Sequence, residues 1–95
     1  MKIHPLSIAT TASLTGNATT LGGVQQVLVQ NTSGAGRYVN IENGDSGTRY
    51  ASFYVQPNQS VIVRKDFDDE IFASSAADGT GAAADVLFTS VGFYA

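Results

Sequence analysis

Two runs of alternating apolar and polar residues constrain this fold more than any other feature of the sequence. Residues 37–43 (RYVNIEN) place Val39 and Ile41 on one face, and residues 49–56 (RYASFYVQ) alternate in the same way. Successive side chains of a β-strand point to opposite faces, so such alternation indicates strands that bury one face. The turn-forming cluster 44–47 (GDSG) separates the two runs. The pattern therefore predicts a β-hairpin.

The apolar positions of this hairpin select one register, because a slip by one residue would mix the two faces. The selected register pairs Val39 with Phe53, Ile41 with Ala51, Tyr38 with Tyr54, Asn40 with Ser52, and Glu42 with Tyr50. It places Tyr38, Tyr50 and Tyr54 together on the polar face. Tyrosine combines a large apolar body with a polar tip, which suits an interaction surface.

The rest of the chain reads as further short strands separated by turns every 8 to 12 residues or so. Extended segments are expected at residues 3–8, 24–31, 60–65, 70–74 and 85–95. A length of 95 residues falls just below the usual domain size of about 100 to 150 residues, which indicates one domain. We predict an all-β fold, a single antiparallel β-sandwich or small barrel of about seven strands. Residues 1–23 would form an extended N-terminal arm and first strand, and residues 24–95 the body.

Composition excludes several classes of function. The chain has no cysteine and one histidine, so it has no disulfide, no thiolate zinc site and no Cys nucleophile, and we expect no metal and no cofactor. No nucleophile, base and orienting group can be assembled, so no catalytic residue is assigned and an enzyme is not expected. A net charge of −3 with five basic residues argues against nucleic-acid binding. No apolar run approaches the roughly 18 residues that span a bilayer, and the start MKIHP interrupts any export signal.

Two stretches of unusual composition lie outside the strands. Residues 66–70 (DFDDE) cluster carboxylates that could hold a hard cation such as calcium, but a solvated turn with Phe67 folded inward is the favoured interpretation. Residues 76–84 (AADGTGAAA) carry no large side chain. We therefore expect a flexible loop that adds nothing to the core and can be shortened at little cost.

The order of motifs along the chain carries a resemblance to a known class of protein. These motifs are VLVQN (27–31), RYVNIENG (37–44), FYVQPNQSVIVRK (53–65), DEIFAS (69–74) and FTSVGFYA (88–95). Over residues 24–95 the chain resembles small β-sandwich virion proteins of tailed bacteriophages, of the capsid decoration type. The resemblance implies a non-enzymatic structural protein that is made in the host cytoplasm and then decorates or stabilises the capsid surface. It implies the major capsid protein as partner, in some cases a homotrimer, and an extended terminal arm as a common attachment device. We expect neither nucleic acid nor membrane as a partner.

Candidate contact residues follow from exposed apolar, aromatic and basic positions. They are Ile3, Leu6, Tyr38, Tyr50, Tyr54, Arg37 and Arg49. Residues 1–6 lead into a Thr- and Gly-rich stretch with little to fix it to the core, so we expect an arm that becomes ordered on binding. The two arginines flank the hairpin and can pair with a partner's carboxylates or form a solvated rim. In the alternative function, a carbohydrate- or receptor-binding module of a phage fibre or bacterial surface protein, the tyrosines stack on sugar rings.

Overall fold

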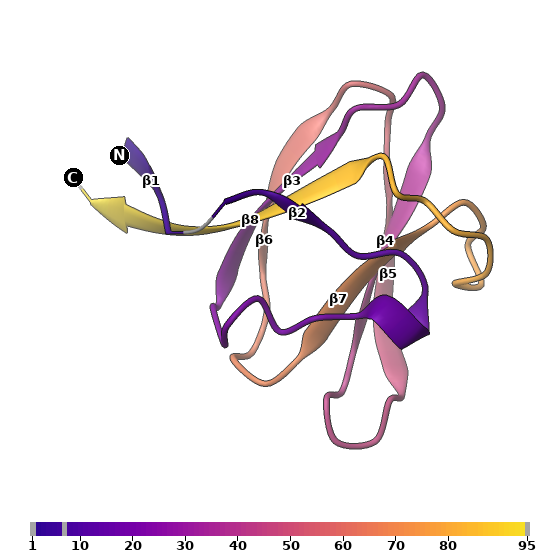
Figure 1. The fold of residues 1–95 in the computed structure, drawn as a ribbon, viewed down its shortest axis with the longest axis horizontal. Helices are drawn as coiled ribbons and strands as arrows, with labels where there is room; N and C mark the ends of the chain where they lie inside the picture. The colour runs from indigo at the N-terminus through magenta and orange to yellow at the C-terminus, as the bar shows by residue number, and fades with distance from the viewer. Residues whose placement is uncertain (1, 7, 95) are drawn as a thin grey trace.

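A computed structural model describes residues 2–6 and 8–94, which form β-strands in two facing antiparallel sheets (Figure 1). In these residues the strands are β1 (Lys2–Pro5), β2 (Thr10–Thr11), β3 (Gln26–Asn31), β4 (Arg37–Glu42), β5 (Arg49–Val55), β6 (Ser60–Arg64), β7 (Glu70–Ser74) and β8 (Val86–Tyr94). One 3-10 turn, η1 (Thr15–Asn17), accompanies them. The predicted all-β fold is confirmed, and it is a sandwich. No helix in the described part of the chain is long and apolar enough to cross a membrane.

The strand order is that of a jelly roll. One sheet runs β1–β8–β3–β6, with β2 also paired to β8, and the other runs β5–β4–β7. Segment 12–19 extends the second sheet, because Ser13 bridges to Ala73 and Thr19 bridges to Ile71 beyond β7. Most strands that follow each other along the chain lie in opposite sheets, which is the double Greek-key connectivity of jelly rolls.

Strand alternation builds the core between the two sheets. In β3, burial alternates residue by residue, as expected for a strand with one covered face. The core side chains that the strands place between the sheets are Val27, Val29, Val39, Ile41, Val55, Ile71, Ala73, Val86 and Phe88, and Phe72 of β7 belongs to the same buried cluster. Ala12 and Ala83 join them from outside the strands. The burial of Ala83 shows that the expectation of no core contribution from loop 76–84 was wrong.

The predicted hairpin between β4 and β5 forms with the predicted register over most of its length. Four of the pairs are as expected: Tyr38 with Tyr54, Val39 with Phe53, Asn40 with Ser52, and Ile41 with Ala51. The register then shifts, and Glu42 lies opposite Arg49. The expected pair of Glu42 with Tyr50 was therefore wrong. Tyr50 is the extra residue of a β-bulge, which period-2 reasoning cannot foresee.

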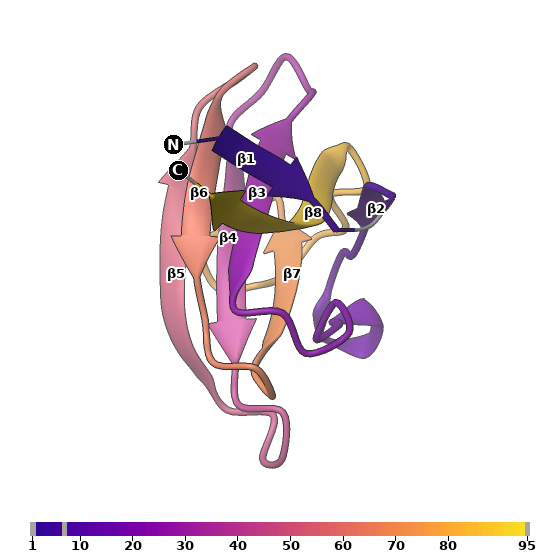
Figure 2. The same cartoon turned by 90° about the vertical axis from the view of Figure 1, so that its left-hand side faces the viewer.

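The two ends of the chain form a ribbon that extends from the body of the sandwich (Figures 1 and 2). Strand β1 pairs antiparallel with residues 91–94 of β8, and the Leu6 amide donates a hydrogen bond to the Ser90 carbonyl at 2.8 Å. The N-terminal arm is extended, as expected, but it is already paired rather than waiting for a partner. The side chain of Ile3 lies outside the described part of the structure.

The stretch that follows the ribbon is tied to both sheets. Strand β2 pairs with β8, the Ala73 amide donates to the Ala12 carbonyl at 2.8 Å, and the Ile71 amide donates to the Thr19 carbonyl at 3.0 Å. The expectation that little fixes this stretch to the core was wrong. Its Thr and Gly residues are fixed through backbone hydrogen bonds, which any residue except proline can donate.

Candidate interaction site

Tyr38 and Tyr54 form an aromatic pair on the outer face of the sheet β5–β4–β7. Their ring centroids are 5.3 Å apart with an interplanar angle of 64°, an edge-to-face arrangement. The pair follows from the hairpin register, which sets the two residues directly opposite each other. Tyr54 remains 53% exposed, and a Cβ atom at Gly36 would collide with its ring. Gly36 is thus required for this position of the Tyr54 ring.

Tyr50 does not join this pair. Its hydroxyl donates a hydrogen bond to the Asp69 carboxylate at the turn between β6 and β7. That hydrogen bond is the main cause that raises the pKa of Tyr50 to about 12. Four residues of strand, about 13 Å, separate Tyr50 from Tyr54 along β5. The tyrosine platform expected from the sequence is therefore a pair, with the third hydroxyl held by the turn.

Arg37 is engaged within the molecule. Its Nε donates to Asp85 Oδ1 and its Nη2 to Asp85 Oδ2, both at 3.1 Å. This bidentate contact holds the pKa of the Asp85 carboxyl below its ordinary value. The remaining Nη1 donates to the Gly36 carbonyl at 3.0 Å. Pairing of Arg37 with a partner's carboxylate would require Asp85 to be displaced first.

Arg49 is likewise engaged, on the outer face of the sheet β5–β4–β7. Its Nη1 donates to the Asn40 side-chain oxygen at 3.2 Å and to the Ala77 carbonyl at 2.8 Å. The same Asn40 oxygen accepts from Ser52 Oγ at 2.9 Å, while Asn40 Nδ2 donates to Ser74 Oγ at 3.0 Å. Asn40 is fully buried. A polar network therefore lies at the centre of a sheet face that the alternation of apolar and polar residues predicts to be solvated.

The loop between β7 and β8 covers this network. Phe72 shares the outer face with Asn40, yet it is only 1% exposed. Gly79 lies above it with φ of +86°, and a Cβ there would be 3.6 Å from the Phe72 ring and 3.0 Å from Arg49 Nη1. The loop closes on itself through backbone bonds from Ser75 to Gly81 and from Ala76 to Thr80. The expectation of a loop without packing was wrong, because the backbone and methyl groups of the loop supply the cover.

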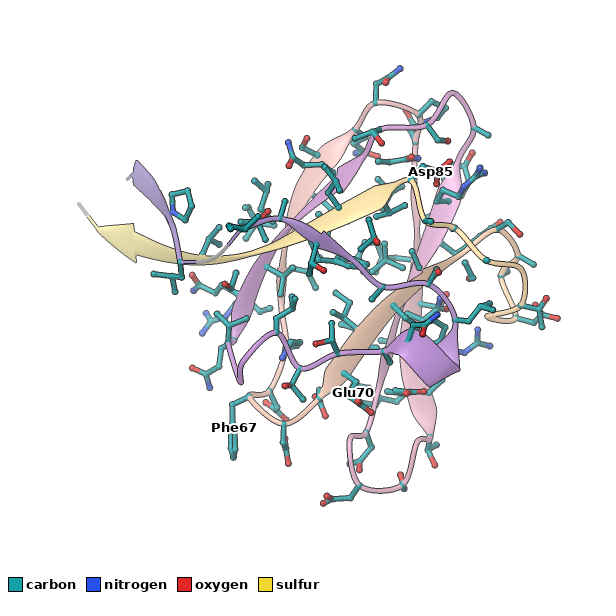
Figure 3. The ribbon with its side chains drawn as sticks, in the orientation of Figure 1. Phe67, Glu70 and Asp85 are labelled. Atoms are coloured by element: carbon teal, nitrogen blue, oxygen red, sulfur yellow. The ribbon has the colours of Figure 1, made fainter. Side chains whose placement is uncertain are left out.

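The acidic turn between β6 and β7 is only partly solvated. Asp69 and Lys65 are 3% and 7% exposed, respectively. Burial lowers the pKa of Lys65, although the neighbouring carboxylates of Asp69, Asp68 and Asp66 oppose that shift. Phe67 is 63% exposed and points away from the body (Figure 3), so the expected inward position was wrong. In the described residues, no group of three or more His, Cys, Asp or Glu side chains is placed to hold a metal ion.

Glu42 and Glu70 lie opposite each other where β4 pairs with β7, and Glu70 lies just above this turn (Figure 3). Burial raises the pKa of Glu42, and the negative charge of Glu70 raises it further. Two carboxylates at one end of the sheet repel each other, which disfavours ionisation of the buried one. The end of the sandwich near the acidic turn is therefore the more acidic end of this sheet.

An apolar cavity opens at the base of the terminal ribbon. It has a volume of about 390 Å³ and is lined by Leu6, Leu21, Gly22, Gly23, Val24 and Ser90. Leu6 is 56% exposed, and Ile8, two residues further on, is 92% exposed. Sequence reasoning selected Leu6 but missed Ile8, Leu21 and Val24. The sequence gives little indication of this role, since Leu21 is an isolated apolar residue in a Thr- and Gly-rich stretch, and Ile8 and Val24 fall in expected strands.

Comparison of the chain with known protein families, curated proteins and solved structures finds no match. Two exposed features of the described structure remain as candidates for an interaction site. One is the terminal ribbon with the apolar cavity at its base. The other is the Tyr38–Tyr54 pair.

Proposed function

We propose that this chain is a non-enzymatic structural protein of a phage virion that decorates or stabilises the assembled capsid by binding the major capsid protein. The observation that carries the proposal is the β1–β8 ribbon, which extends from the body of the sandwich (Figure 1). A projecting ribbon can lie on a neighbouring surface while the core stays intact. The resemblance to capsid decoration proteins, which implies an attachment arm, supports the same role.

The base of the ribbon supplies the apolar surface that such a contact needs. Leu6, which lines the cavity, and Ile8, two residues further along the chain, are both largely exposed. Burying one such side chain stabilises a complex by roughly 1.5 to 3 kcal/mol. Exposed apolar clusters on small proteins commonly mark interaction sites. Because the chain is acidic, an apolar contact also suits a shell whose outer surface is acidic.

The jelly-roll connectivity is compatible with this role. Viral capsid domains and lectins both use jelly rolls, so the fold agrees with capsid attachment and with the carbohydrate-binding alternative. Proteins with the same fold have many different functions, so the function has to be inferred from the site. The ribbon favours attachment to a large surface, whereas the tyrosine pair favours a small ligand that can stack on an aromatic ring, such as a sugar.

The proposal is tested by co-sedimentation of the purified protein with expanded and unexpanded heads of the phage that encodes it. Wild-type protein is expected to sediment with one or both forms. The double variant Leu6→Asp with Ile8→Asp places charges at the base of the ribbon. We expect its binding to be weaker than that of wild type by about tenfold or more. Phe67→Asp, which charges an exposed apolar site on the acidic turn, is the matched control and should bind like wild type.

Two results would count against the proposal. Wild-type protein that sediments with neither form of the head would contradict capsid binding itself. A double variant that binds as tightly as wild type, with unchanged melting, would show that the base of the ribbon is not the contact. Truncation of residues 1–8 is a poorer test, because it also leaves residues 91–94 of β8 without their paired strand.

The second candidate, a carbohydrate- or receptor-binding module, rests on the Tyr38–Tyr54 pair. The exposed Tyr54 ring offers a face on which a sugar ring can stack, and Gly36 fixes that ring in place. A glycan array probed with wild type and Tyr54→Ala separates the two functions. Glycan binding that is lost in Tyr54→Ala, in a protein that does not sediment with heads, would favour this second candidate.

A further inference from the structure

Among the described residues the two sheets present four edges, and three of these edges are interrupted or covered. The β1–β2 edge is split into two short strands and contains Pro5. The β7 edge is bridged by Ser13 and Thr19, and the β5 edge carries the bulge at Tyr50. These are the devices by which β proteins avoid edge-to-edge association. Strand β6 (Ser60–Arg64, SVIVR) has none of them, since it is regular and lacks proline and lysine.

The hydrogen-bond pattern shows which backbone groups of β6 face the open edge. The Asn31 amide donates to the Gln59 carbonyl at 3.0 Å, and the Lys65 amide donates to the Gln25 carbonyl at 2.8 Å. These bonds bracket the β3–β6 ladder. Hydrogen-bonded residues alternate in an antiparallel ladder, so the odd-numbered residues of β6 bond to β3. The N–H and C=O groups directed to the edge belong to Ser60, Ile62 and Arg64.

We propose that two copies of this chain form a dimer in which β6 of one copy pairs antiparallel with β6 of the other across a two-fold axis at Ile62. In this register Ile62 faces Ile62 of the second copy, and Ser60 faces Arg64 at both ends. The outward N–H and C=O groups of all three residues are then hydrogen-bonded to the second copy. A shift of two residues in either direction leaves one of them beyond the end of the paired strand.

The side chains of β6 fit this register as well as the backbone does. Ile62 is 41% exposed on the outer face, next to Leu28 on β3, so each copy brings an apolar pair to the axis. Val61 and Val63 are partly buried on the core side. Across the axis, Val61 of each copy faces Val63 of the other copy. Cross-strand pairs of β-branched residues are favourable, whereas like charges placed opposite each other are not. The single charge of the strand, Arg64, faces a serine.

A second copy is the occupant that this strand fits, because every favourable pair arises from one five-residue sequence read in both directions. Such self-complementarity is the requirement for a two-fold interface. The β6 edge lies across the sheet β1–β8–β3–β6 from the ribbon, so pairing at β6 leaves both ribbons accessible. The dimer would present two attachment ribbons, and two linked contacts bind a surface more tightly than one.

Cross-linking tests the register directly, because the chain has no cysteine of its own. Cα atoms of a hydrogen-bonded antiparallel pair are about 5.5 Å apart. Their Cβ atoms, at up to about 5.5 Å, are too far apart for an unstrained disulfide but close enough for a short reagent that joins two thiols. Ile62→Cys is therefore expected to give a covalent dimer with a methylene-bridged bis(methanethiosulfonate), a reagent of this kind. Ser60→Cys is the matched control, because its sulfur lies four residues, about 13 Å, from its counterpart. Equal cross-linking of the two variants, or none with Ile62→Cys, would overturn the register.

Sedimentation equilibrium tests the dimer itself, on purified protein without capsids, so its result is independent of the proposed function. Wild type should show a monomer–dimer equilibrium in the micromolar range. Ile62→Pro removes an N–H that faces the edge rather than β3, a position where a strand tolerates proline. We expect its dimer dissociation constant to rise about tenfold or more. Ile8→Lys changes an exposed apolar residue away from β6 and should leave the dimer unchanged.

Several results would overturn the dimer. These are a wild type that stays monomeric, a trimer, or a dimer that Ile8→Lys weakens and Ile62→Pro does not. Thermal melting of Ile62→Pro establishes that the variant folds. Should it fail to fold, the two cysteine variants decide the outcome alone, because each keeps the backbone of β6.

Discussion

The loop at residues 75–85 packs more closely against the body, and the turn at residues 66–69 exposes its aromatic residue more, than the side chains of either suggest. The loop consists of small residues, yet it buries Phe72 and closes over the network of Asn40 and Arg49. The turn carries a large aromatic residue, yet Phe67 stays exposed while Asp69 is buried. The burial of a connection is therefore decided by the sheet face that it crosses. The size of its own side chains matters less.

The largest expected effect contrasts the two phenylalanines. Phe72→Ala removes a fully buried ring and should lower the free energy of unfolding by about 3 to 5 kcal/mol. Phe67→Ala removes an exposed ring and should change it by no more than about 0.5 kcal/mol. Urea denaturation of both variants measures the contrast, with Phe72→Leu as a milder substitution if Phe72→Ala is unfolded. Equal losses in the two alanine variants would show that the loop does not cover Phe72.

The second prediction separates backbone strain from contact. Gly79 and Gly22 both have positive φ, +86° and +73°, but only Gly79 has neighbours within 4 Å of an added Cβ. Gly22→Ala should cost about 1 kcal/mol from strain alone. Gly79→Ala should cost roughly 1 to 3 kcal/mol more, because its methyl group presses on Arg49 and Phe72. Equal melting temperatures for the two variants would contradict the close packing of the loop.

The third prediction concerns the buried side of the turn. The neutral Tyr50 phenol donates to Asp69, which raises the pKa of Tyr50 from 10.0 to about 12. A pKa raised by folding stabilises the protein below the unfolded value and ceases to do so as pH rises through the folded value. Wild type should therefore lose stability between about pH 10 and 12 more steeply than Tyr50→Phe. Denaturation across this interval measures the difference, with Tyr38→Phe, outside the turn, as the matched control.

The smallest expected effect is at the end of the loop, where Asp85 accepts from Arg37. The two side chains are 38% and 21% exposed, so solvent screening limits the loss in Asp85→Asn to about 0.2 to 1 kcal/mol. The pKa of Asp85 is lowered from 3.8, so its contribution is present above that value and disappears as pH falls through the folded pKa. Melting at neutral and strongly acidic pH checks both statements. A loss that persists in strong acid would point to another cause.

The strands and most of the hairpin register could be predicted because alternation records which face is buried. Val39 and Ile41 face Phe53 and Ala51 as expected, since any other register would expose them. The same reasoning fails at Tyr50, because a bulge adds one residue and leaves no mark in the hydrophobic pattern. Asn40 was expected on a solvated face, and only the later loop makes that face an interior.

The candidate site was less predictable than the fold. Leu6 could be selected as an apolar residue in a terminal segment, but Leu21 and Val24 line the cavity only because the chain folds back beside Leu6 and Ser90. Arg37 and Arg49 read as free cations in the sequence, because Asp85 and Ala77 lie 48 and 28 residues away from them. Pairings over such separations leave no local pattern.

The position of β8 at the centre of its sheet determines the order in which the protein can fold during synthesis. Of the strands described, β8 is made last, yet it lies between β3 and the two N-terminal strands. The β4–β5 hairpin can form early because its residues are close in sequence, whereas β1 has to wait for nearly the whole chain. Until residues 86–94 leave the ribosome, the first sheet holds only the β3–β6 pair, and Val27 and Val29 lack their partners on β8. We therefore expect the core to be completed only after β8 has been made, in one late step that pairs β8 with β1 and β3.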